Sequence, residues 1–186
     1  MEKRFNPENL HRLDNPEKRK ALPPEKLLGQ LNIQENDTVV DLGAGAGYFT
    51  IPAAKFCQKV YAVDVEPKML GHLEAKLSEE AVTNVVTVEG QIEKIPLEDQ
   101  FADHVIASLV MHEVEPLQDG LKEMNRILKP GGRVLCVEWE KKPMEQGPPL
   151  KHRIHSSDLV KFFEQYGFSV EELMFPNDQF YVIIAQ

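Results

Sequence analysis

Stretches of apolar, often β-branched residues alternate along the chain with segments in which apolar residues recur at helical spacing. Strands and helices that alternate in this way are typical of a parallel sheet covered by helices on both faces. The pattern therefore predicts an α/β fold with a doubly wound sheet. The five expected parallel strands are Thr38–Leu42, Val60–Asp64, Asn84–Glu89, His104–Leu109 and Arg133–Trp139.

Proline and glycine indicate where two of the intervening helices begin and end. We expect one helix from Pro67 to about Leu77 and another that begins at Pro116, because proline is favoured in the first turn of a helix. The segment Lys129–Gly132 contains a proline and two glycines. It is expected to end the second helix and to turn the chain into the next strand.

The last third of the chain predicts a helix followed by two closely spaced strands. Ser156 or Ser157 is expected to cap a helix that runs to about Tyr166. Strands are expected at Ser169–Met174 and Gln179–Ala185, and the short connection between them permits only an antiparallel hairpin. The complete expectation is a sheet of seven strands, mostly parallel, with an antiparallel C-terminal hairpin.

Length and charge limit the organisation and the partners. A chain of 186 residues suits a single domain, with an N-terminal helical segment at 1–35 and the sheet core at 36–186. The net charge of −9 would repel a phosphate backbone, so no nucleic acid partner is expected. We expect a cytoplasmic protein without a membrane span, because the sequence has no long apolar stretch and no secretion signal.

The two cysteines, Cys57 and Cys136, lie far apart in apolar surroundings. They form no Cys-x-x-Cys pair, and no histidine stands at metal-ligand spacing. We expect buried, reduced thiols and no metal site.

A glycine-rich turn follows the first strand, where Asp41 precedes Gly43, Gly45 and Gly47. Such a turn, leading into a helix, places backbone N–H groups at the carboxyl edge of the sheet, where nucleotide-like ligands bind. Tyr48 stands where a dinucleotide-binding turn needs a small residue, and no Lys-Ser/Thr pair follows, as an ATP-binding loop would require. The turn therefore favours a different nucleotide-like ligand.

Two carboxylates narrow the choice of ligand. Asp41 would repel a pyrophosphate, whereas it suits a ligand whose nearest group is a cationic ammonium. Asp64 ends the second strand, where a carboxylate can accept hydrogen bonds from the two hydroxyls of a ribose. Together these residues favour a nucleoside with a cationic ammonium group.

Three segments, Val39–Gly47, Ala62–Val65 and Leu128–Arg133, resemble the motifs of the class I S-adenosylmethionine-dependent methyltransferases. The resemblance extends from about Thr38 to the C-terminus. It implies a Rossmann-like sheet, S-adenosylmethionine as cofactor and S-adenosylhomocysteine as product. The cofactor-binding residues that it implies are Asp41, Gly43, Ala44, Gly45, Gly47, Asp64, Val65, Met69, Gln91, Ile92 and Ser108.

Within that family the resemblance is to the subgroup that includes ubiquinone and menaquinone C-methyltransferases. Members of this subgroup commonly have an acidic residue where this chain has Gln91, whose side-chain carbonyl can still accept a hydrogen bond from the adenine amino group. Arsenic methyltransferases use several cysteines to hold arsenic. Cys57 and Cys136 do not supply such a set.

Methyl transfer from a sulfonium depends on alignment and does not require a dedicated catalytic residue. If the acceptor must lose a proton, we expect His112, just beyond the fourth strand, to be the base, with a hydrogen-bonded structural histidine as the alternative. Glu138 and Trp139 end the fifth strand at the same edge and are candidates for an acceptor pocket. Packing is the alternative role for Trp139.

The segment Phe5–Pro24 is a candidate cover for the cofactor. Its four prolines forbid one long helix, while its leucines offer apolar anchors. Arg12 or Arg19 would then meet the methionine carboxylate.

Glu140–His155 is the longest irregular segment in the core, and it is either a lid or a connector. His152, Arg153 and His155 would lie over the site in the first case and on solvated surface in the second.

The expected function is methyl transfer to a small-molecule acceptor, because only short loops remain to recognise a macromolecule. One alternative is a protein that holds the cofactor without catalysis, as a sensor or a partner subunit. A nicotinamide-dependent reductase is the other, and Asp41 and Tyr48 argue against it. Fold and cofactor site do not determine the acceptor.

Overall fold

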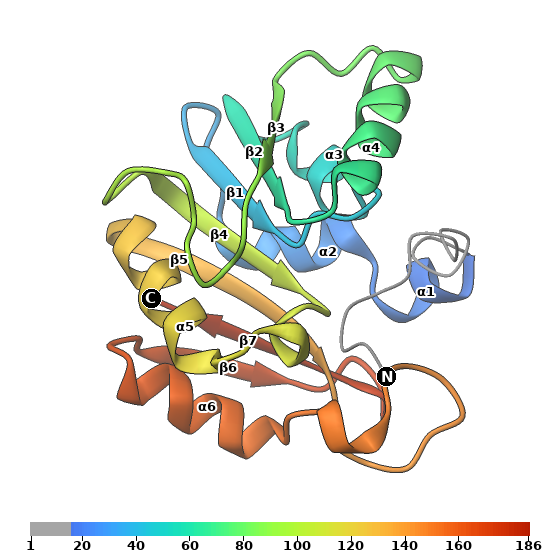
Figure 1. Ribbon diagram of the computed structural model, residues 1–186, viewed down its shortest axis with the longest axis vertical. Coiled ribbons are helices and arrows are strands. Elements are labelled where there is room, and N and C mark those ends of the chain that lie inside the picture. The colour runs from blue at the N-terminus through green and yellow to red at the C-terminus, as the bar shows by residue number, and fades with distance from the viewer. Residues whose placement is uncertain (1–15) are drawn as a thin grey trace.

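Seven strands form one twisted sheet in this computed structural model, which describes residues 16–186 (Figure 1). The strand order is β3-β2-β1-β4-β5-β7-β6; the first five strands run parallel, and β7 runs antiparallel to β5 and β6. The predicted fold is therefore confirmed. The strands are β1 (Thr38–Leu42), β2 (Lys59–Asp64), β3 (Val85–Glu89), β4 (Ala102–Ser108), β5 (Leu128–Trp139), β6 (Val170–Met174) and β7 (Phe180–Ala185).

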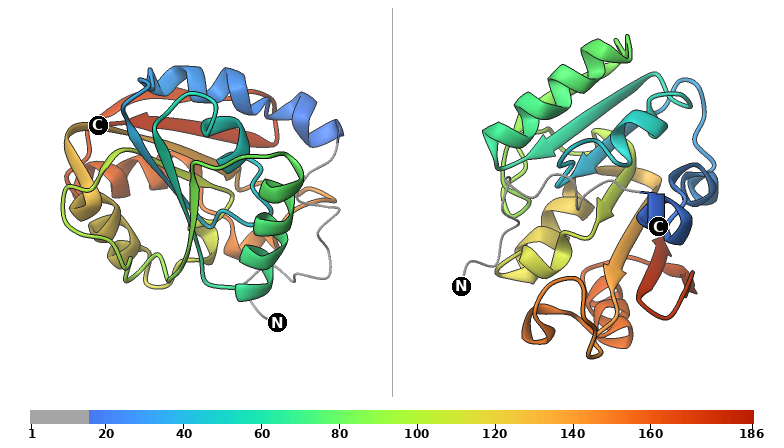
Figure 2. Two further views of the ribbon diagram at one scale, coloured as in Figure 1. Left: turned by 90° about the horizontal axis from the view of Figure 1, so that it is seen from above. Right: turned by 90° about the vertical axis from the view of Figure 1, so that its right-hand side faces the viewer.

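Helices cover both faces of the sheet (Figure 2). The α-helices are α1 (Pro16–Ala21), α2 (Pro24–Leu28), α3 (Thr50–Ala53), α4 (Pro67–Glu79), α5 (Leu117–Ile127) and α6 (Ser156–Gln165). Short 3-10 helices lie at η2 (Gly29–Leu31), η3 (Met111–Glu113) and η4 (Leu150–His152). Helices α5 and α6 pack on one face, whereas α2 and α3 pack on the other.

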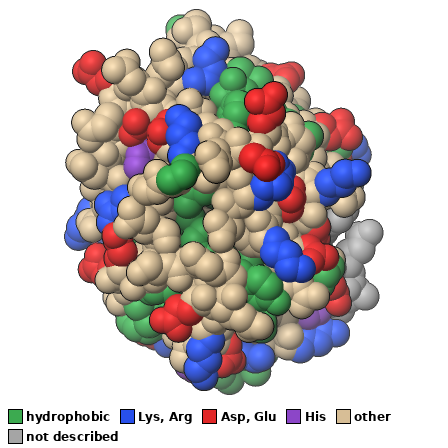
Figure 3. Space-filling model, turned by 90° about the vertical axis from the view of Figure 1, so that its left-hand side faces the viewer, with side chains coloured by type: hydrophobic (Ala, Val, Ile, Leu, Met, Phe, Trp, Pro, Cys, Tyr) green, Lys and Arg blue, Asp and Glu red, His purple; other side chains and the backbone are tan. Residues whose placement is uncertain are grey.

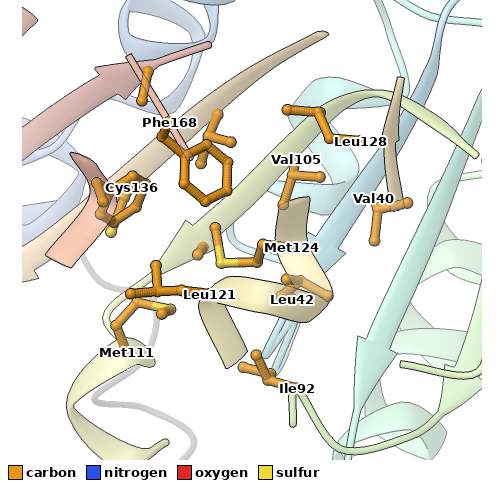
Figure 4. Packing of buried hydrophobic residues seen from close by; sticks show 14 of the residues in the cluster. Val40, Leu42, Ile92, Val105, Met111, Leu121, Met124, Leu128, Cys136 and Phe168 are labelled. Atoms are coloured by element: carbon orange, nitrogen blue, oxygen red, sulfur yellow. The ribbon is translucent and has the colours of Figure 1, made fainter. Parts of the chain in front are cut away.

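The alternation of side chains along β5 explains the two cores. Val134 and Cys136 contribute to the core under α5 and α6, whereas Leu135 and Val137 contribute to the core under α2. Figure 4 shows the first of these cores, in which Met124 of α5 lies against the sheet. Because successive strand residues point to opposite faces, a strand buried on both sides is continuously apolar. This is the pattern that the sequence displays.

The N-terminal part of β5 departs from the prediction. We expected Lys129–Gly132 to form a turn before the strand, but β5 already begins at Leu128, directly after α5. Leu128 pairs with Ala102 and Arg133 pairs with His104, so that the four intervening residues bulge opposite one residue of β4. Gly131 has φ +82°, which a glycine adopts without strain.

The cap of α6 is also different from the expectation. Neither serine caps the helix, because His155 occupies the N-cap position and its Nδ1 accepts the backbone N–H of Ser157 at 3.3 Å. An imidazole nitrogen can accept a hydrogen bond as a hydroxyl does. The predicted helix itself is confirmed at Ser156–Gln165.

The cysteines are free and buried, as expected, and burial raises the pKa of the Cys57 thiol to about 11. Within residues 16–186, no group of three His, Cys, Asp or Glu side chains is arranged to hold a metal ion. The longest helix in this part of the chain is α4, with 13 residues, and none is long and apolar enough to cross a bilayer. Acidic and basic side chains are interspersed over the surface that Figure 3 shows.

Candidate active site

The carboxyl ends of the parallel strands border a cavity of about 1190 Å³. In Figure 1 the arrowheads of these strands point to the side where α1 and the segment between β5 and α6 lie. Ten of the eleven residues expected to bind the cofactor line this cavity, and the exception is Gly47. His112 and Trp139 line it as well.

The glycine turn approaches the neighbouring strand ends closely. Gly43 has φ +67°, and a Cβ atom there would lie 2.4 Å from Val110 Cγ2. The N–H groups of Gly43 and Ala44 both donate to the carbonyl of Val63, at 2.8 and 3.0 Å. The Gly45 N–H donates to Asp64 Oδ2 at 2.8 Å.

These contacts correct one part of the sequence interpretation. We expected the turn to offer N–H groups and a helix N-terminus to the ligand, but three of those N–H groups are engaged within the protein. The helix that follows, α3, has only four residues and begins at Thr50. With its N–H groups used in this way, the turn is less suited to an anion, which agrees with the charge of Asp41.

Gly47 allows α4 to pack closely against the glycine turn. Its φ is +84°, and a Cβ atom there would lie 2.6 Å from Leu73 Cδ1 of α4. Its N–H donates to the Ala44 carbonyl at 2.9 Å, which closes the turn. Gly47 therefore shapes the turn from behind.

Asp41 is buried beneath the turn and lines the cavity. Its Oδ2 accepts the hydroxyl of Thr50 at 2.6 Å. Burial raises the pKa of Asp41 from 3.8 to about 7, with a smaller contribution in the same direction from the charge of Asp64, while the Thr50 hydrogen bond opposes the shift. A cation in the cavity would favour the ionised carboxylate.

Asp64 ties the end of β2 to the glycine turn. Its Oδ2 accepts the Gly45 N–H, and its Oδ1 accepts the Glu66 N–H at 2.9 Å. Burial raises the pKa of Asp64, although both hydrogen bonds oppose the shift. Each carboxylate oxygen has a second lone pair, so Asp64 can still accept hydroxyl donors from the cavity.

His112 and Glu138 form a buried pair at the ends of two neighbouring strands. His112 lies in η3, after β4, and its Nδ1 is 2.9 Å from both carboxylate oxygens of Glu138. Glu138 is 0% exposed, and it also accepts the backbone N–H groups of His112 and Trp139 at 3.2 and 3.0 Å.

The pair fixes the imidazole. Because a carboxylate only accepts hydrogen bonds, the proton of a neutral His112 ring resides on Nδ1, and Nε2 keeps its lone pair. The expectation that Glu138 lines an acceptor pocket is wrong, because Glu138 lies behind His112 and is not among the residues that line the cavity. Successive strand residues face opposite ways, so Trp139 reaches the cavity from the other face.

The segment between β5 and α6 contributes Gln146–Pro149 to the cavity wall. Arg153 is only 4% exposed, so the alternative that places Arg153 on solvated surface is wrong. Its guanidinium donates to three backbone carbonyls of this segment, which a sequence does not reveal. His155 caps α6 and is more than half exposed.

One part of the wall was missed in the sequence analysis. Gln179 and Phe180 at the start of β7 line the cavity, because Phe180 pairs with Trp139 across the antiparallel ladder. The C-terminal hairpin expected from the sequence could have indicated this, because it places the start of β7 beside the end of another strand. From α1, Pro16, Glu17 and Lys18 also line the cavity.

The proposed cover at Phe5–Pro24 is described only from Pro16 onward, and Arg12 lies outside the described residues. Arg19 is not among the residues that line the cavity; its guanidinium carbon lies 5.5 Å from the centre of the Tyr48 ring. The Tyr48 hydroxyl donates to the Leu22 carbonyl at 2.7 Å. The residue that excludes a dinucleotide turn thus anchors the N-terminal segment.

Comparisons with known proteins agree with this geometry. Residues 40–136 match a family described as a methyltransferase domain. A ubiquinone/menaquinone biosynthesis C-methyltransferase from Francisella tularensis subsp. novicida is 32% identical over 151 residues, which cover 77% of this chain and 54% of the relative. A demethylmenaquinone methyltransferase from Bacillus subtilis is 28% identical over 123 residues, or 64% of this chain and 53% of the relative. This chain spans about half the length of these curated relatives.

A solved structure agrees over almost the whole chain. The crystal structure of a SAM dependent methyltransferase from Aquifex aeolicus superimposes with a TM-score of 0.91 at 27% identity and covers 98% of each chain. None of these comparisons favours a binding protein without catalysis or a nicotinamide-dependent reductase. The chain therefore belongs to the class I S-adenosylmethionine-dependent methyltransferases, and it is similar to the ubiquinone and menaquinone C-methyltransferases.

Proposed function

We propose that this chain methylates a small-molecule acceptor, which binds in the same cavity as the cofactor. The observation that supports this most directly is the size of the cavity. Its volume, about 1190 Å³, exceeds the range of roughly 300–1,000 Å³ for a pocket that holds one ligand. The cofactor side consists of the glycine turn and the ends of β2 and β3, and the acceptor side consists of His112, Trp139, Gln146–Pro149 and Phe180.

The residues of the cofactor side fit S-adenosylmethionine. Asp41 would attract the methionine ammonium, and Asp64 would accept the ribose hydroxyls, while Met69 and Ile92 offer apolar contacts to the adenine. Lys18, which lines the cavity, replaces Arg19 as the candidate partner of the methionine carboxylate. When bound, the cofactor supplies the methyl group as an electrophilic carbon on a sulfonium.

His112 is proposed as the general base. Glu138 holds the ring by Nδ1. Nε2, which lies 3.8 Å from Glu113 Oε1, is the nitrogen that would take a proton from the acceptor. A carboxylate that orients an imidazole in this way also stabilises the imidazolium that forms. Glu138 is therefore proposed as a positioning residue, because it acts through His112.

The lining of the cavity bears on the charge of the acceptor. Among residues 16–186, six carboxylates and one lysine border the cavity, and the acceptor side is largely aromatic and proline-rich. An anion would be repelled there, so we propose an uncharged or cationic acceptor with apolar surface. The six carboxylates are Glu17, Asp41, Asp64, Glu66, Glu93 and Glu113.

Calorimetry and a methyl-transfer assay test the proposal. We expect S-adenosylmethionine and S-adenosylhomocysteine to bind and NAD not to bind. With radiolabelled S-adenosylmethionine, a panel of small molecules should include uncharged, cationic and anionic acceptors of similar size. Transfer to members of the first two groups supports the proposal, and transfer to anions alone contradicts it.

We further propose that the N-terminal segment covers the cofactor and completes one domain over residues 1–186. Support comes from α1, which lines the cavity, and from the Tyr48–Leu22 hydrogen bond. Deleting residues 1–20 should weaken S-adenosylhomocysteine binding about tenfold or more, because the bound state loses part of its wall. A deletion of residues 1–15 separates the contribution of α1 from that of the preceding residues. Wild-type affinity in both variants would refute the cover.

A further inference from the structure

The acceptor side of the cavity has a wall that is held by one buried arginine. Arg153 follows η4, at the end of the long segment between β5 and α6. Its Nε donates to the Pro148 carbonyl at 2.8 Å, its Nη1 to Lys142 at 2.9 Å and its Nη2 to Gln146 at 2.6 Å. Hydrogen bonds from a charged donor are worth more than those between neutral groups. One side chain therefore joins three points of an otherwise irregular segment.

Trp139 lies against the same segment. The guanidinium carbon of Arg153 is 5.5 Å from the centre of the Trp139 ring, within the range of a cation–π contact. Gly147 has φ +88°, and a Cβ atom there would lie 2.9 to 3.0 Å from the six-membered part of the indole. The backbone of Gly147 therefore lies directly against the indole.

Two further contacts fix the other sides of this wall. The rings of Trp139 and Phe180 have their centres 4.3 Å apart, and both line the cavity. The Tyr181 hydroxyl donates to the carbonyl of Ile154, next to Arg153 in sequence, at 3.1 Å. The indole is thus enclosed by β7 and by the segment that Arg153 holds.

We propose that Arg153 is a positioning residue that holds Gln146–Pro149 against Trp139 and thereby sets the shape of the acceptor side of the cavity. The assignment of this wall to the acceptor rests on the proposed function, whereas the contacts by which Arg153 holds the wall do not. Since the guanidinium bonds only to backbone carbonyls, it acts through the segment and does not touch the reacting atoms. A wall that is fixed before binding selects acceptors by shape and avoids the cost of ordering a loop on binding.

Trp139 makes the proposal testable without knowledge of the acceptor, because it is the only tryptophan in the sequence. Its fluorescence, excited where tyrosine does not absorb, reports on this wall alone. The variants are Arg153→Lys, which keeps the charge but loses the fork of donors, and Arg153→Met, which keeps the apolar stem. Arg133→Met is the matched control, because Arg133 also donates to a backbone carbonyl, that of Gln30 at 2.7 Å, and does not line the cavity.

In Arg153→Met we expect quenching of Trp139 by acrylamide to rise about twofold or more, with an emission shift to longer wavelength, as the segment opens. Arg153→Lys should fall between Arg153→Met and wild type, and Arg133→Met should match wild type. Far-ultraviolet circular dichroism and calorimetric binding of S-adenosylhomocysteine, expected within about twofold of wild type, establish that the variants are folded. Unchanged Trp139 emission and quenching in a folded Arg153→Met protein would overturn the proposal.

Measurements of turnover distinguish a failure of this proposal from a failure of the proposed function. With an acceptor found in the panel, Arg153→Met should raise the acceptor KM about tenfold or more and leave kcat at saturation within about threefold of wild type. An unchanged KM would overturn the role in acceptor binding. If the fluorescence changes as expected but no panel member is methylated, the wall is supported and the proposed function is contradicted.

Discussion

The cofactor side and the acceptor side of the cavity are built in different ways. The cofactor side uses the backbone of one continuous turn, which three N–H groups and Asp64 hold against β2. The acceptor side is assembled from the ends of β4, β5 and β7 and from the segment between β5 and α6. Two of its contacts, His112 with Glu138 and Trp139 with Phe180, join residues more than twenty positions apart. A short motif is enough to specify the first, whereas the second depends on the topology of the sheet.

The largest effect should come from removing the proposed base. His112→Ala should lower methyl transfer on the order of a hundredfold or more, because proton transfer by a positioned side chain contributes that much. Binding of S-adenosylhomocysteine should stay near wild type, since His112 belongs to the acceptor side. Steady-state turnover and calorimetry measure the two effects, with the exposed His72 of α4, changed to Ala, as the control. Full turnover in His112→Ala would remove this residue from the mechanism.

The second effect should appear on the cofactor side. Gly43→Ala places a Cβ atom 2.4 Å from Val110 Cγ2 and imposes a side chain at φ +67°. The turn must shift, and we expect S-adenosylhomocysteine to bind about tenfold more weakly or worse, with a loss of stability of about 1–3 kcal/mol. Calorimetry and thermal unfolding measure these changes.

Gly71→Ala in α4 is the matched control, because nothing lies within 4 Å of the Cβ position there. That substitution should leave binding unchanged and raise stability slightly, since alanine favours a helix more than glycine. The double variant Gly43→Ala/Val110→Ala should recover part of the affinity. If Gly43→Ala alone binds normally, the close approach of the turn to Val110 is not needed for the cofactor.

A smaller effect is expected when the orientation of His112 is altered. Glu138→Gln removes one of the two oxygens that face Nδ1 and places an amide donor in the pair. Turnover should fall about tenfold, because the ring loses its fixed tautomer and orientation while the base itself remains. Glu172→Gln on the exposed face of β6 is the control. A Glu138→Gln enzyme as active as wild type would show that the buried pair serves stability alone.

The contrast between the two sides also explains what the sequence predicts well. The positions of the strands follow from apolar runs. The residues of the cofactor side follow from the glycine-rich turn and from the resemblance of short segments to family motifs, and all of these are local patterns. Glu138 was misjudged because its partner His112 is distant in sequence. The burial of Arg153 depends on how the irregular segment around it folds, which no local pattern predicts. Glu138 and Trp139 are consecutive residues at the end of β5, and consecutive strand residues point to opposite faces of the sheet. The sequence alone could therefore have shown that the two residues have different roles.

Asp41 provides the smallest predicted effect and the most specific one. Burial raises its pKa to about 7, so its carboxyl group is partly protonated at neutral pH. The ammonium group of a ligand favours the ionised form, and S-adenosylhomocysteine affinity should therefore rise several-fold from about pH 6 to pH 8. Asp41→Asn should bind more weakly at pH 8 and show little dependence on pH. If calorimetry shows the same dependence of affinity on pH in Asp41→Asn as in wild type, another group is responsible for it.

Without ligand, the stability of the folded protein changes with pH in the direction opposite to the change in ligand affinity. The folded state keeps the Asp41 proton up to about pH 7, whereas the unfolded chain releases it near its ordinary value of 3.8. The free energy of unfolding therefore decreases as the pH rises from about 4 to 7, and Asp41→Asn removes this decrease. The melting temperature of the variant relative to wild type should increase with pH, while Asp119→Asn on the surface of α5 shows no such trend. Saturating S-adenosylhomocysteine should reduce this difference in melting temperature between the variant and wild type. Only the wild type has the buried carboxylate, whose ionised form the ligand stabilises.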